Sequence, residues 1–526
     1  MSAEKPDSEQ PVGPKQGSLL RSSGLVGVMT MLSRVLGLAR DIVIANFFGA
    51  GAGADAFFVA FKIPNFMRRL FAEGAFSQAF VPVLSEYRTT VTPAETRVLI
   101  NSVAGTLGLV LVLITVVAVA AAPLLTAVFA PGFLDDDIKF GLTADMLRIT
   151  FPYLFLISMT AFAGAILNSY GNFAVPAFTP VLLNLSLIGS VYFLTPYLDL
   201  PVMALAWGVM IAGFAQLFFQ LPFLAKLGLL PKPKVNRQHE GVRRILKLMT
   251  PALFGVSVSQ VNLLLDTILA SFLVTGSVSW LYYSDRLSEL PLGVFGIAIA
   301  TVILPSLSRK HASANTGEFS ATLDWAVRAV LLIGIPAALA LMVLAVPLIS
   351  TLFQHGALAD EDVLMSAQSL RAYAVGLLFF MLIKVLATGY FSRQDTKTPV
   401  KVGVVAMVAN MVLNLMLVVP LAHAGLALAT SLSAALNAGL LWNGLRRQGI
   451  YSAQPGWWRF AGQLVGASVM MVALLLWLNP ADEYWLSADV WKKIFWMALL
   501  CFGGGAVYFV SLFASGVRIR QFRMRD

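Results

Sequence analysis

The chain has 526 residues, of which 58% are hydrophobic and only 12% are charged, whereas a soluble domain usually carries about 25% charged residues. This composition is typical of a polytopic membrane protein, and the single cysteine, Cys501, excludes a disulfide framework and a cysteine-based metal site. The formal net charge of +10 is expected to lie in cytoplasmic loops, so it does not indicate a nucleic-acid partner.

The first 22 residues are polar and contain acids, and no short apolar core with a cleavage site follows them, so they predict a cytoplasmic tail. After them come fourteen apolar segments, each long enough, at about 20 residues, to cross the hydrocarbon core as a helix. The sequence therefore predicts an all-α polytopic membrane protein with fourteen transmembrane helices. The segments lie near residues 24–48, 55–84, 98–122, 145–169, 175–196, 201–225, 249–273, 277–307, 324–352, 364–391, 399–421, 424–445, 460–478 and 491–514.

The distribution of charge in the connections predicts the orientation of these segments. Even-numbered connections are basic, above all the sixth, at 227–248, while odd-numbered ones are neutral or acidic, as in "GFLDDD" and "GALADEDV". Because basic loops stay on the cytoplasmic side, we expect both termini, including the basic tail at 517–526, in the cytoplasm.

Two halves of the sequence align at a nearly constant offset. Pro82 and Pro305 are 305 − 82 = 223 residues apart, and the same offset relates Ser85 to Ser308, Leu147 to Leu370 and Pro176 to Pro399. Prolines set kinks and loop boundaries, so this agreement favours a repeat over a coincidence among common residues. Each half holds six segments, an even number, so the copies insert the same way up, as parallel repeats. We expect an N-lobe at 23–226, a C-lobe at 249–447 and two added helices at 448–516.

Charged side chains inside membrane segments indicate function, because each is costly to bury there. They concentrate in the first, second and eighth segments, which the repeat places at the interface between lobes. Arginines exceed acids in the first two segments, and guanidinium groups fit phosphate oxygens, so this set predicts an anionic ligand. The alternative is a set of internal salt bridges. The residues are Arg34, Arg40, Asp41, Asp55, Lys62, Arg68, Arg69, Glu73, Asp285, Arg286 and Glu289.

Helical spacing restricts how the first-segment charges can act together. Arg34 and Arg40 are six residues apart, which is roughly 120° around a helix. They need a bend, for which Gly37 is suited, or different contacts, to serve one ligand. Asp41 is expected to restrain an arginine when no ligand is bound.

A second polar set lies in the C-lobe. Asp266 is a lone acid in the seventh segment, Asn410 and Asn414 share a face of the eleventh, and Thr430 follows in the twelfth. Oxygen ligands on three helices predict a site for a monovalent cation such as Na⁺, and the alternative is an interhelical hydrogen-bond cluster. No other cofactor is expected, and coupling to Na⁺, to H⁺ or to the membrane potential stays open.

Four stretches carry a resemblance to a known family: "SRVLGLARD" at 33–41, "GADAFFVAFKIPNFMRRLFAEGAFSQAFVPVLSEY" at 53–87, "GSVSWLYYSDRLSELPLGVFGIAIATVILPSLS" at 276–308 and "FSRQDTKTPVK" at 391–401. They resemble the MurJ (MviN) family of bacterial lipid II flippases, which belongs to the multidrug/oligosaccharidyl-lipid/polysaccharide exporter superfamily. The likeness runs from about residue 20 to the C-terminus.

This resemblance implies a transporter of the bacterial cytoplasmic membrane that moves lipid II, the undecaprenyl-diphosphate precursor of peptidoglycan, to the outer leaflet by alternating access. It implies substrate binding by Arg34, Arg40, Arg68 and Arg286, with the other membrane charges in support, and a groove for the lipid tail at 448–516. A sodium site in the C-lobe is found in some members. Lipid II, membrane lipids and the cell-wall synthesis machinery are the implied partners.

Two rival functions remain. Another lipid-linked oligosaccharide exporter of the same fold would share every feature above. An integral membrane transferase would need an acid/base pair or a metal site near the membrane surface. The four histidines lie in separate loops or at segment ends, so an enzyme is not expected.

Overall fold

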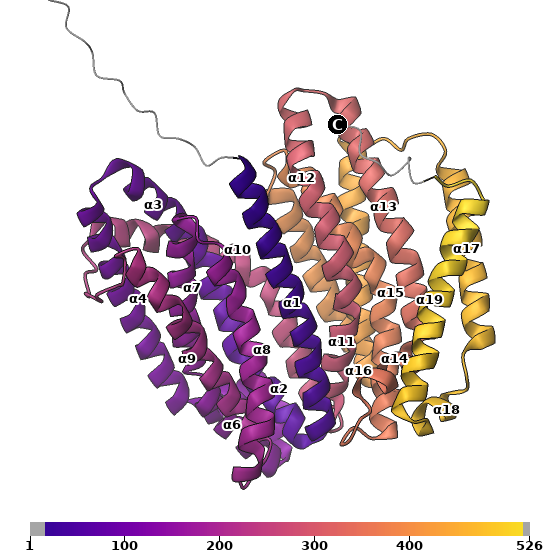
Figure 1. Ribbon diagram of the computed structural model, residues 1–526, viewed down its shortest axis with the longest axis horizontal. Coiled ribbons are helices and arrows are strands. Elements are labelled where there is room, and N and C mark those ends of the chain that lie inside the picture. The colour runs from indigo at the N-terminus through magenta and orange to yellow at the C-terminus, as the bar shows by residue number, and fades with distance from the viewer. Residues whose placement is uncertain (1–15, 519–526) are drawn as a thin grey trace, which may run out of the picture.

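The computed structural model describes the backbone of residues 16–518, and the side chains of this range except those of residues 16–23, 71–73, 252, 254–261 and 263. Within that range the chain is helical and contains no strand, which confirms the predicted all-α class. Two groups of long helices lean apart at one end of the molecule and converge at the other (Figure 1). We call these the splayed end, where α3 and α12 finish, and the converging end, where α1 finishes and α2 and α11 begin.

The N-lobe comes first in the chain. It comprises α1 (Gln16–Phe48), α2 (Ala52–Arg68), η1 (Arg69–Phe76), α3 (Ser77–Thr90), α4 (Pro93–Ala120), α5 (Ala122–Phe129), η2 (Pro131–Asp135), α6 (Asp137–Thr150), α7 (Tyr153–Ser169), α8 (Ala174–Leu194), η3 (Thr195–Tyr197) and α9 (Met203–Lys226).

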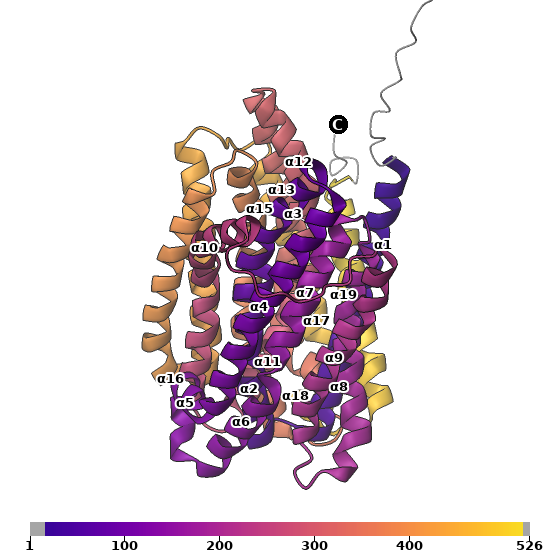
Figure 2. The same cartoon turned by 90° about the vertical axis from the view of Figure 1, so that its left-hand side faces the viewer.

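The C-lobe and two added long helices complete the molecule. The C-lobe comprises α10 (Glu240–Ser271), α11 (Ser277–Pro291), η4 (Leu292–Gly296), α12 (Ile297–Ala312), α13 (Thr316–Val343), α14 (Ala345–Phe353), α15 (Asp360–Phe391) and α16 (Lys397–Arg447). The added part comprises α17 (Trp457–Leu478), α18 (Asp482–Ser487) and α19 (Val490–Ala514). Figure 2 shows α10 beside α16, and α10 also packs against η1 and α3 of the N-lobe.

The described part of the chain contains 10 helical stretches that are long and apolar enough to cross a membrane. They include eleven of the fourteen predicted segments, because α16 holds two, on either side of a kink at Ala422 (φ 47°, ψ −130°). The other three segments, near 24–48, 55–84 and 249–273, are helical in α1, in α2 to α3 and in α10. The chain is therefore a multi-pass membrane protein, and fourteen spans are compatible with these helices.

The two lobes repeat the same local irregularities. A π-helical turn begins at Arg69 in η1 and at Leu292 in η4, and 292 − 69 = 223. The break between α4 and α5 falls at Ala121, that between α13 and α14 falls at Leu344, and 344 − 121 = 223. Irregularities that recur at the offset of the sequence repeat show that the two copies share their backbone path as well as their sequence.

Helix ends differ from two predicted boundaries. Residues 16–22 belong to α1 and not to the predicted polar tail, and residues 240–248 belong to α10 and not to the predicted loop at 227–248. Polar residues at a helix end can extend into water without breaking the helix, so hydropathy placed these boundaries too close to the membrane. The short α18 between the last two long helices was not anticipated.

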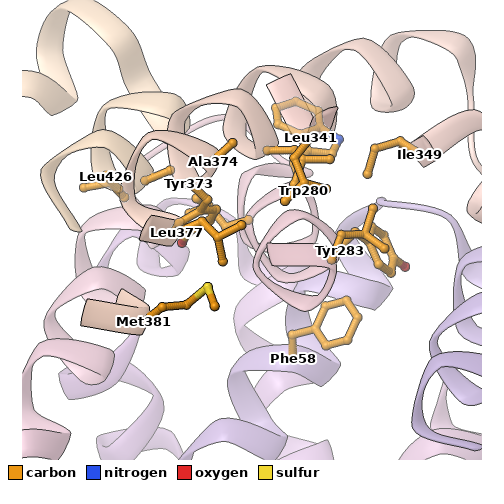
Figure 3. Packing of buried hydrophobic residues seen from close by; sticks show 14 of the residues in the cluster. Phe58, Trp280, Tyr283, Leu341, Ile349, Tyr373, Ala374, Leu377, Met381 and Leu426 are labelled. Atoms are coloured by element: carbon orange, nitrogen blue, oxygen red, sulfur yellow. The ribbon is translucent and has the colours of Figure 1, made fainter. Parts of the chain in front are cut away.

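Apolar packing joins the lobes at the converging end. The Phe58 ring of α2 meets the Tyr283 ring of α11 edge-on at 5.7 Å (Figure 3). The Tyr283 ring in turn lies 5.2 Å from the Phe353 ring of α14. A separate apolar cluster, including Phe80 and Phe162, fills the splayed end of the N-lobe and packs against the first turns of α10. The lobes thus share their main apolar core near the converging end.

Candidate functional site between the lobes

The charged residues of "SRVLGLARD" lie on α1, which runs as a continuous helix through Gly37. Arg40 is 7% exposed and Asp41 is fully buried. Burying such charges is costly unless they are paired and hydrogen-bonded, so the partners of these two residues decide what the site can do.

One carboxylate bridges α1 and α11. Asp41 Oδ1 accepts hydrogen bonds from Arg40 Nε at 2.9 Å, from Arg40 Nη2 at 2.6 Å and from the Tyr282 hydroxyl at 2.9 Å. Asp41 Oδ2 accepts a hydrogen bond from Arg286 Nε at 2.7 Å. A single buried negative charge is therefore shared between two guanidinium groups, one from each lobe.

Further partners hold the two arginines unequally. Arg40 Nη1 donates to Asn184 Oδ1 of α8 at 3.2 Å, and Asn184 donates back to the Ser33 carbonyl at 3.0 Å. Arg286 Nη1 makes only a long contact of 3.4 Å with Glu289, whose side chain is 51% exposed. Arg40 is thus locked inside the N-lobe, while Arg286, with 31% of its side chain exposed, has freedom to meet a ligand.

Two glycines allow arginines to cross the seam between the lobes. A Cβ at Gly37 would lie 2.7 Å from Arg286 Nη2, so a larger residue there would displace that guanidinium from its position against α1. A Cβ at Gly293 of η4 would overlap the Arg34 guanidinium, so Arg34 reaches the C-lobe. Arg34 and Arg40 therefore have different neighbours, and within the described residues no hydrogen bond or ion pair holds Arg34.

Asp55 lies apart from the arginines and fastens the start of α11. Its Oδ2 accepts from the Gly276 amide at 2.7 Å, and its Oδ1 accepts from the amide and hydroxyl of Ser279 at 2.9 and 2.6 Å. A carboxylate at a helix N-terminus satisfies free amides and opposes the helix dipole. Asp55 therefore ties the N-lobe to the C-lobe at the converging end.

Three more hydrogen bonds close this end. Lys139 of α6, which is 4% exposed, donates to the Thr275 hydroxyl at 2.9 Å. The Tyr283 hydroxyl donates to the Gly49 carbonyl at 2.7 Å, and the Ala357 amide donates to the Asn46 carbonyl at 2.8 Å. Together with Asp55 they form what we call the converging-end seal.

The remaining predicted charges are not joined to Asp41. Lys62 interacts electrostatically with Asp266 and Asp285. Arg68 donates to Asn65 of its own helix at 3.1 Å, and Arg69 is exposed at the start of η1. The side chain of Glu73 lies outside the described residues. π-Helical turns such as η1 are frequent at functional sites, which keeps Arg68 and Arg69 candidates for ligand binding.

The four predicted cation ligands lie together. Asn414 Nδ2 donates to Asp266 Oδ1 at 2.7 Å and to Asn410 Oδ1 at 3.1 Å. The Thr430 hydroxyl lies 3.5 Å from Asp266 Oδ2 and accepts from Asn410 Nδ2 at 3.4 Å. The kink at Ala422 brings Thr430 back against the first half of α16. Asn414 Oδ1 is buried and has no hydrogen-bond partner among the described residues.

At the splayed end, a peripheral ion pair joins α10 to α3. Arg244 lies 2.8 Å from Glu86, and both side chains are about half exposed. The hydrogen bond from Arg244 holds the pKa of Glu86 below its usual value. Exposed pairs contribute little to stability, so this contact is a weak restraint beside the buried ties of the seal.

Sequence reasoning missed Tyr282, Asn184 and Lys139. Tyr282 lies three residues before Asp285, which was singled out, and Asn184 is a lone amide in an apolar segment, so polarity within a segment could have flagged both. Lys139 follows the acidic run at 135–137, which predicts a solvated loop, so only the fold shows that Lys139 is buried.

Two helical lobes with charged groups buried at their seam define a multi-pass membrane transporter. An inward-facing multidrug resistance MATE family transporter of the MOP superfamily shares this fold, with a TM-score of 0.66 over 81% of this chain and 98% of its own, at 14% identity. The family model of the lipid II flippase MurJ matches residues 44–495. The chain belongs to the lipid II flippase MurJ family, as its sequence motifs predict.

Individual relatives agree with this assignment. A probable lipid II flippase MurJ of Vibrio cholerae is 51% identical over 512 residues, which cover 96% of this chain and 98% of that protein. A solved structure of a lipid II flippase MurJ in an inward closed conformation superposes with a TM-score of 0.78 over 93% of this chain and 99% of its own, at 26% identity. The match in length means that the two added helices are part of the shared architecture.

Proposed function

We propose that this protein flips lipid II from the inner to the outer leaflet of the bacterial cytoplasmic membrane by alternating access, with both termini in the cytoplasm. Membership of the lipid II flippase family supports the substrate, and the charge pattern of the connections supports the orientation. The observation that supports this binding site is that Asp41 pairs with both Arg40 and Arg286. One acid shared between two arginines leaves positive charge available to a diphosphate.

The proposed mechanism uses the unequal hold on the arginines. A diphosphate–sugar headgroup cannot cross about 30 Å of hydrocarbon without partners that replace its water. Arg34, which lacks a partner in the described residues, and the half-held Arg286 would bind phosphate oxygens first, while Arg40 stays fixed by Asp41 and Asn184. Binding at the seam would then draw the lobes together at the splayed end and release the converging-end seal.

Depletion in living cells tests this function. When the protein is depleted, lipid II is expected to accumulate in the inner leaflet, where an externally added lipid II-cleaving toxin cannot reach it. Lipid II that stays accessible from outside after full depletion would contradict the proposal. Accumulation of another undecaprenyl-linked oligosaccharide, with lipid II unaffected, would support the rival exporter function.

Arg34→Ala is expected to reduce flipping about ten- to 100-fold, because a charge-assisted hydrogen bond contributes about 1.5–3 kcal/mol. Its thermal unfolding should change little, because no partner in the described residues loses a contact. Complementation of depleted cells and the unfolding temperature of the purified protein measure the two effects. Arg34→Lys keeps the charge and should restore part of the activity, whereas a fully active Arg34→Ala protein would remove Arg34 from substrate binding.

We also propose that Asp266, Asn410, Asn414 and Thr430 hold a monovalent cation such as Na⁺ as the coupling ion. The donor set fits, since it offers a carboxylate, two amide oxygens and a hydroxyl, and the unpartnered Asn414 Oδ1 is an acceptor without a donor. Such an ion would supply positive charge beside Asp266. The hydrogen bonds within the cluster also suit the purely structural alternative, so the ion needs a direct test.

Asp266→Asn should abolish stabilisation by sodium, because a ligand that binds the folded state raises the unfolding temperature by mass action. The measurement is the unfolding temperature of the purified protein in NaCl compared with choline chloride. Asp285→Asn is the matched control, since it removes another acid that faces Lys62 and is not one of the four ligands. Sodium-dependent stabilisation that persists in Asp266→Asn, or transport that is independent of sodium, would rule out this site.

We propose that the lipid tail of the substrate lies along the outer faces of α17 and α19. Their lipid-facing side chains include Trp477, 80% exposed, and Phe502, 81% exposed.

We further propose that the protein contacts the cell-wall synthesis machinery and that it catalyses no enzymatic step. A purified protein that cleaves or transfers a bond of lipid II would instead favour the transferase alternative.

A further inference from the structure

A pocket of about 370 Å³ lies where α13, α17 and the end of α19 meet, well away from the seam between the lobes. Its walls include Trp325 and Arg328 of α13, Arg459 and Gln463 of α17, and Gly516 just after α19. The volume is within the range of about 300–1,000 Å³ typical of small-ligand sites. It lies at the end of the molecule where α17 begins and α19 finishes, the proposed cytoplasmic side (Figure 1).

The walls of the pocket are rigidly built. Arg328 pairs with the buried Asp324 at 2.8 Å and donates to the carbonyls of Gln454 and Pro455, both at 3.1 Å. Asp324 also accepts from the Tyr451 hydroxyl at 2.6 Å and from Trp457 Nε1 at 2.7 Å. This network fixes the linker between the C-lobe and α17, so the pocket keeps its shape without a ligand.

Two hydrogen-bond donors that line the pocket have no acceptor within the described residues. Arg459 is exposed and forms no hydrogen bond or ion pair within the described residues. Trp325 Nε1 is buried and has no acceptor there. No side chain caps the N-terminus of α17 at Gly456, so its first amides add a positive dipole end. None of the residues that line the pocket is acidic.

We propose that this pocket binds the phosphate of an anionic phospholipid from the cytoplasmic leaflet. Basic pockets between membrane helices on the cytoplasmic side are suited to phospholipid headgroups, and that leaflet carries the anionic lipids. Trp458, 93% exposed beside Arg459, has the position of an aromatic residue at the membrane interface. The site is separate from the substrate arginines and does not depend on the identity of the transported lipid.

The source of the phosphate is a phospholipid because the pocket opens beside surfaces that face acyl chains. Phe513, one turn before the Gly516 wall, is 45% exposed and apolar, as a lipid-facing residue is. A soluble phosphate would gain the same donors but nothing from this apolar flank. A binding experiment with inorganic phosphate alone therefore distinguishes a phospholipid ligand from a soluble phosphate ligand.

Native mass spectrometry of the full chain with added phosphatidylglycerol tests the proposal. The wild type should retain this lipid in preference to phosphatidylcholine, and Arg459→Gln should bind it about fivefold more weakly, which is the effect of losing one basic residue at a membrane surface. Trp325→Phe, which removes the unpartnered donor, should also weaken binding. Inorganic phosphate should compete poorly with the lipid.

Arg447→Gln is the matched control, because Arg447 is an exposed arginine at the same end that does not line the pocket. Unfolding temperatures in phosphatidylcholine should be equal for all three variants, which shows that the linker is intact. If Arg459→Gln and Arg447→Gln weaken phosphatidylglycerol binding equally, diffuse surface charge causes the effect, and the proposed site is wrong. Binding of phosphate with no preference among lipids would overturn the phospholipid as its ligand.

Discussion

Arg286→Ala is expected to impair lipid II flipping strongly while the protein still folds and inserts. Its guanidinium shares Asp41 with Arg40, so its loss leaves Asp41 paired at 2.6 Å with Arg40 and hydrogen-bonded to Tyr282. The buried acid therefore keeps a cation as its partner, and only its Oδ2 atom loses a hydrogen bond. Transport loses one of the two arginines free to bind a diphosphate, and with it about 1.5–3 kcal/mol of charge-assisted binding, or about ten- to 100-fold.

Two comparisons separate this substrate effect from a structural one. Arg40→Ala should lower the free energy of unfolding more than Arg286→Ala does, by about 1.5–3 kcal/mol, because it removes two charge-assisted hydrogen bonds to the buried Asp41 and the contact with Asn184. Glu289→Gln should leave transport nearly unchanged, since it removes only the exposed contact at 3.4 Å. Complementation of depleted cells, protein abundance in the membrane and thermal unfolding report these effects. Normal transport by Arg286→Ala would contradict the proposed role of Arg286.

Much of the fold can be predicted from the sequence, because a few physical requirements, above all apolar length, define a membrane-spanning helix. Apolar length located eleven segments in helices that are apolar enough to span, the other three segments are also helical, and the offset of 223 recurs in the breaks at Ala121 and Leu344. Hydropathy cannot place helix ends in water, which is why α1 and α10 begin earlier than predicted. The kink at Ala422 depends on a single left-handed residue that is not a glycine, and no turn motif marks it.

The sequence predicts which residues form the site but not which of them pair with one another. Charges inside apolar segments mark Arg40, Asp41 and Arg286 without any structure, because such charges need a reason to be there. That Asp41 serves both arginines depends on how α1 meets α11, which helical periodicity cannot supply. The same limit explains Asp55, which was grouped with the arginines because of its charge and instead fastens the N-terminus of α11.

Asp55→Ala should release the converging-end seal. The substitution removes a fully buried carboxylate that receives three hydrogen bonds from the C-lobe. Even one such charge-assisted bond is worth about 1.5–3 kcal/mol, so the population opened at this end should rise at least about tenfold. Lys139→Met removes one hydrogen bond, to Thr275, and a cation–π contact with Phe133, and should open the seal less. Transport should fall in Asp55→Ala, because alternating access requires each end to close in turn.

The opening can be measured as chemical accessibility of a residue inside the seal. Ser277 is fully buried and its hydroxyl has no partner in the described residues, so Ser277→Cys, made together with Cys501→Ser, is a small change. In intact cells, a membrane-impermeant maleimide should label the introduced thiol slowly in otherwise unchanged protein and at least about tenfold faster with Asp55→Ala. Labelling from outside would also place the converging end at the outer face, as the charge of the connections predicts. If the labelling rate is the same with and without Asp55, the seal does not control access at this end, and Asp55 only caps α11.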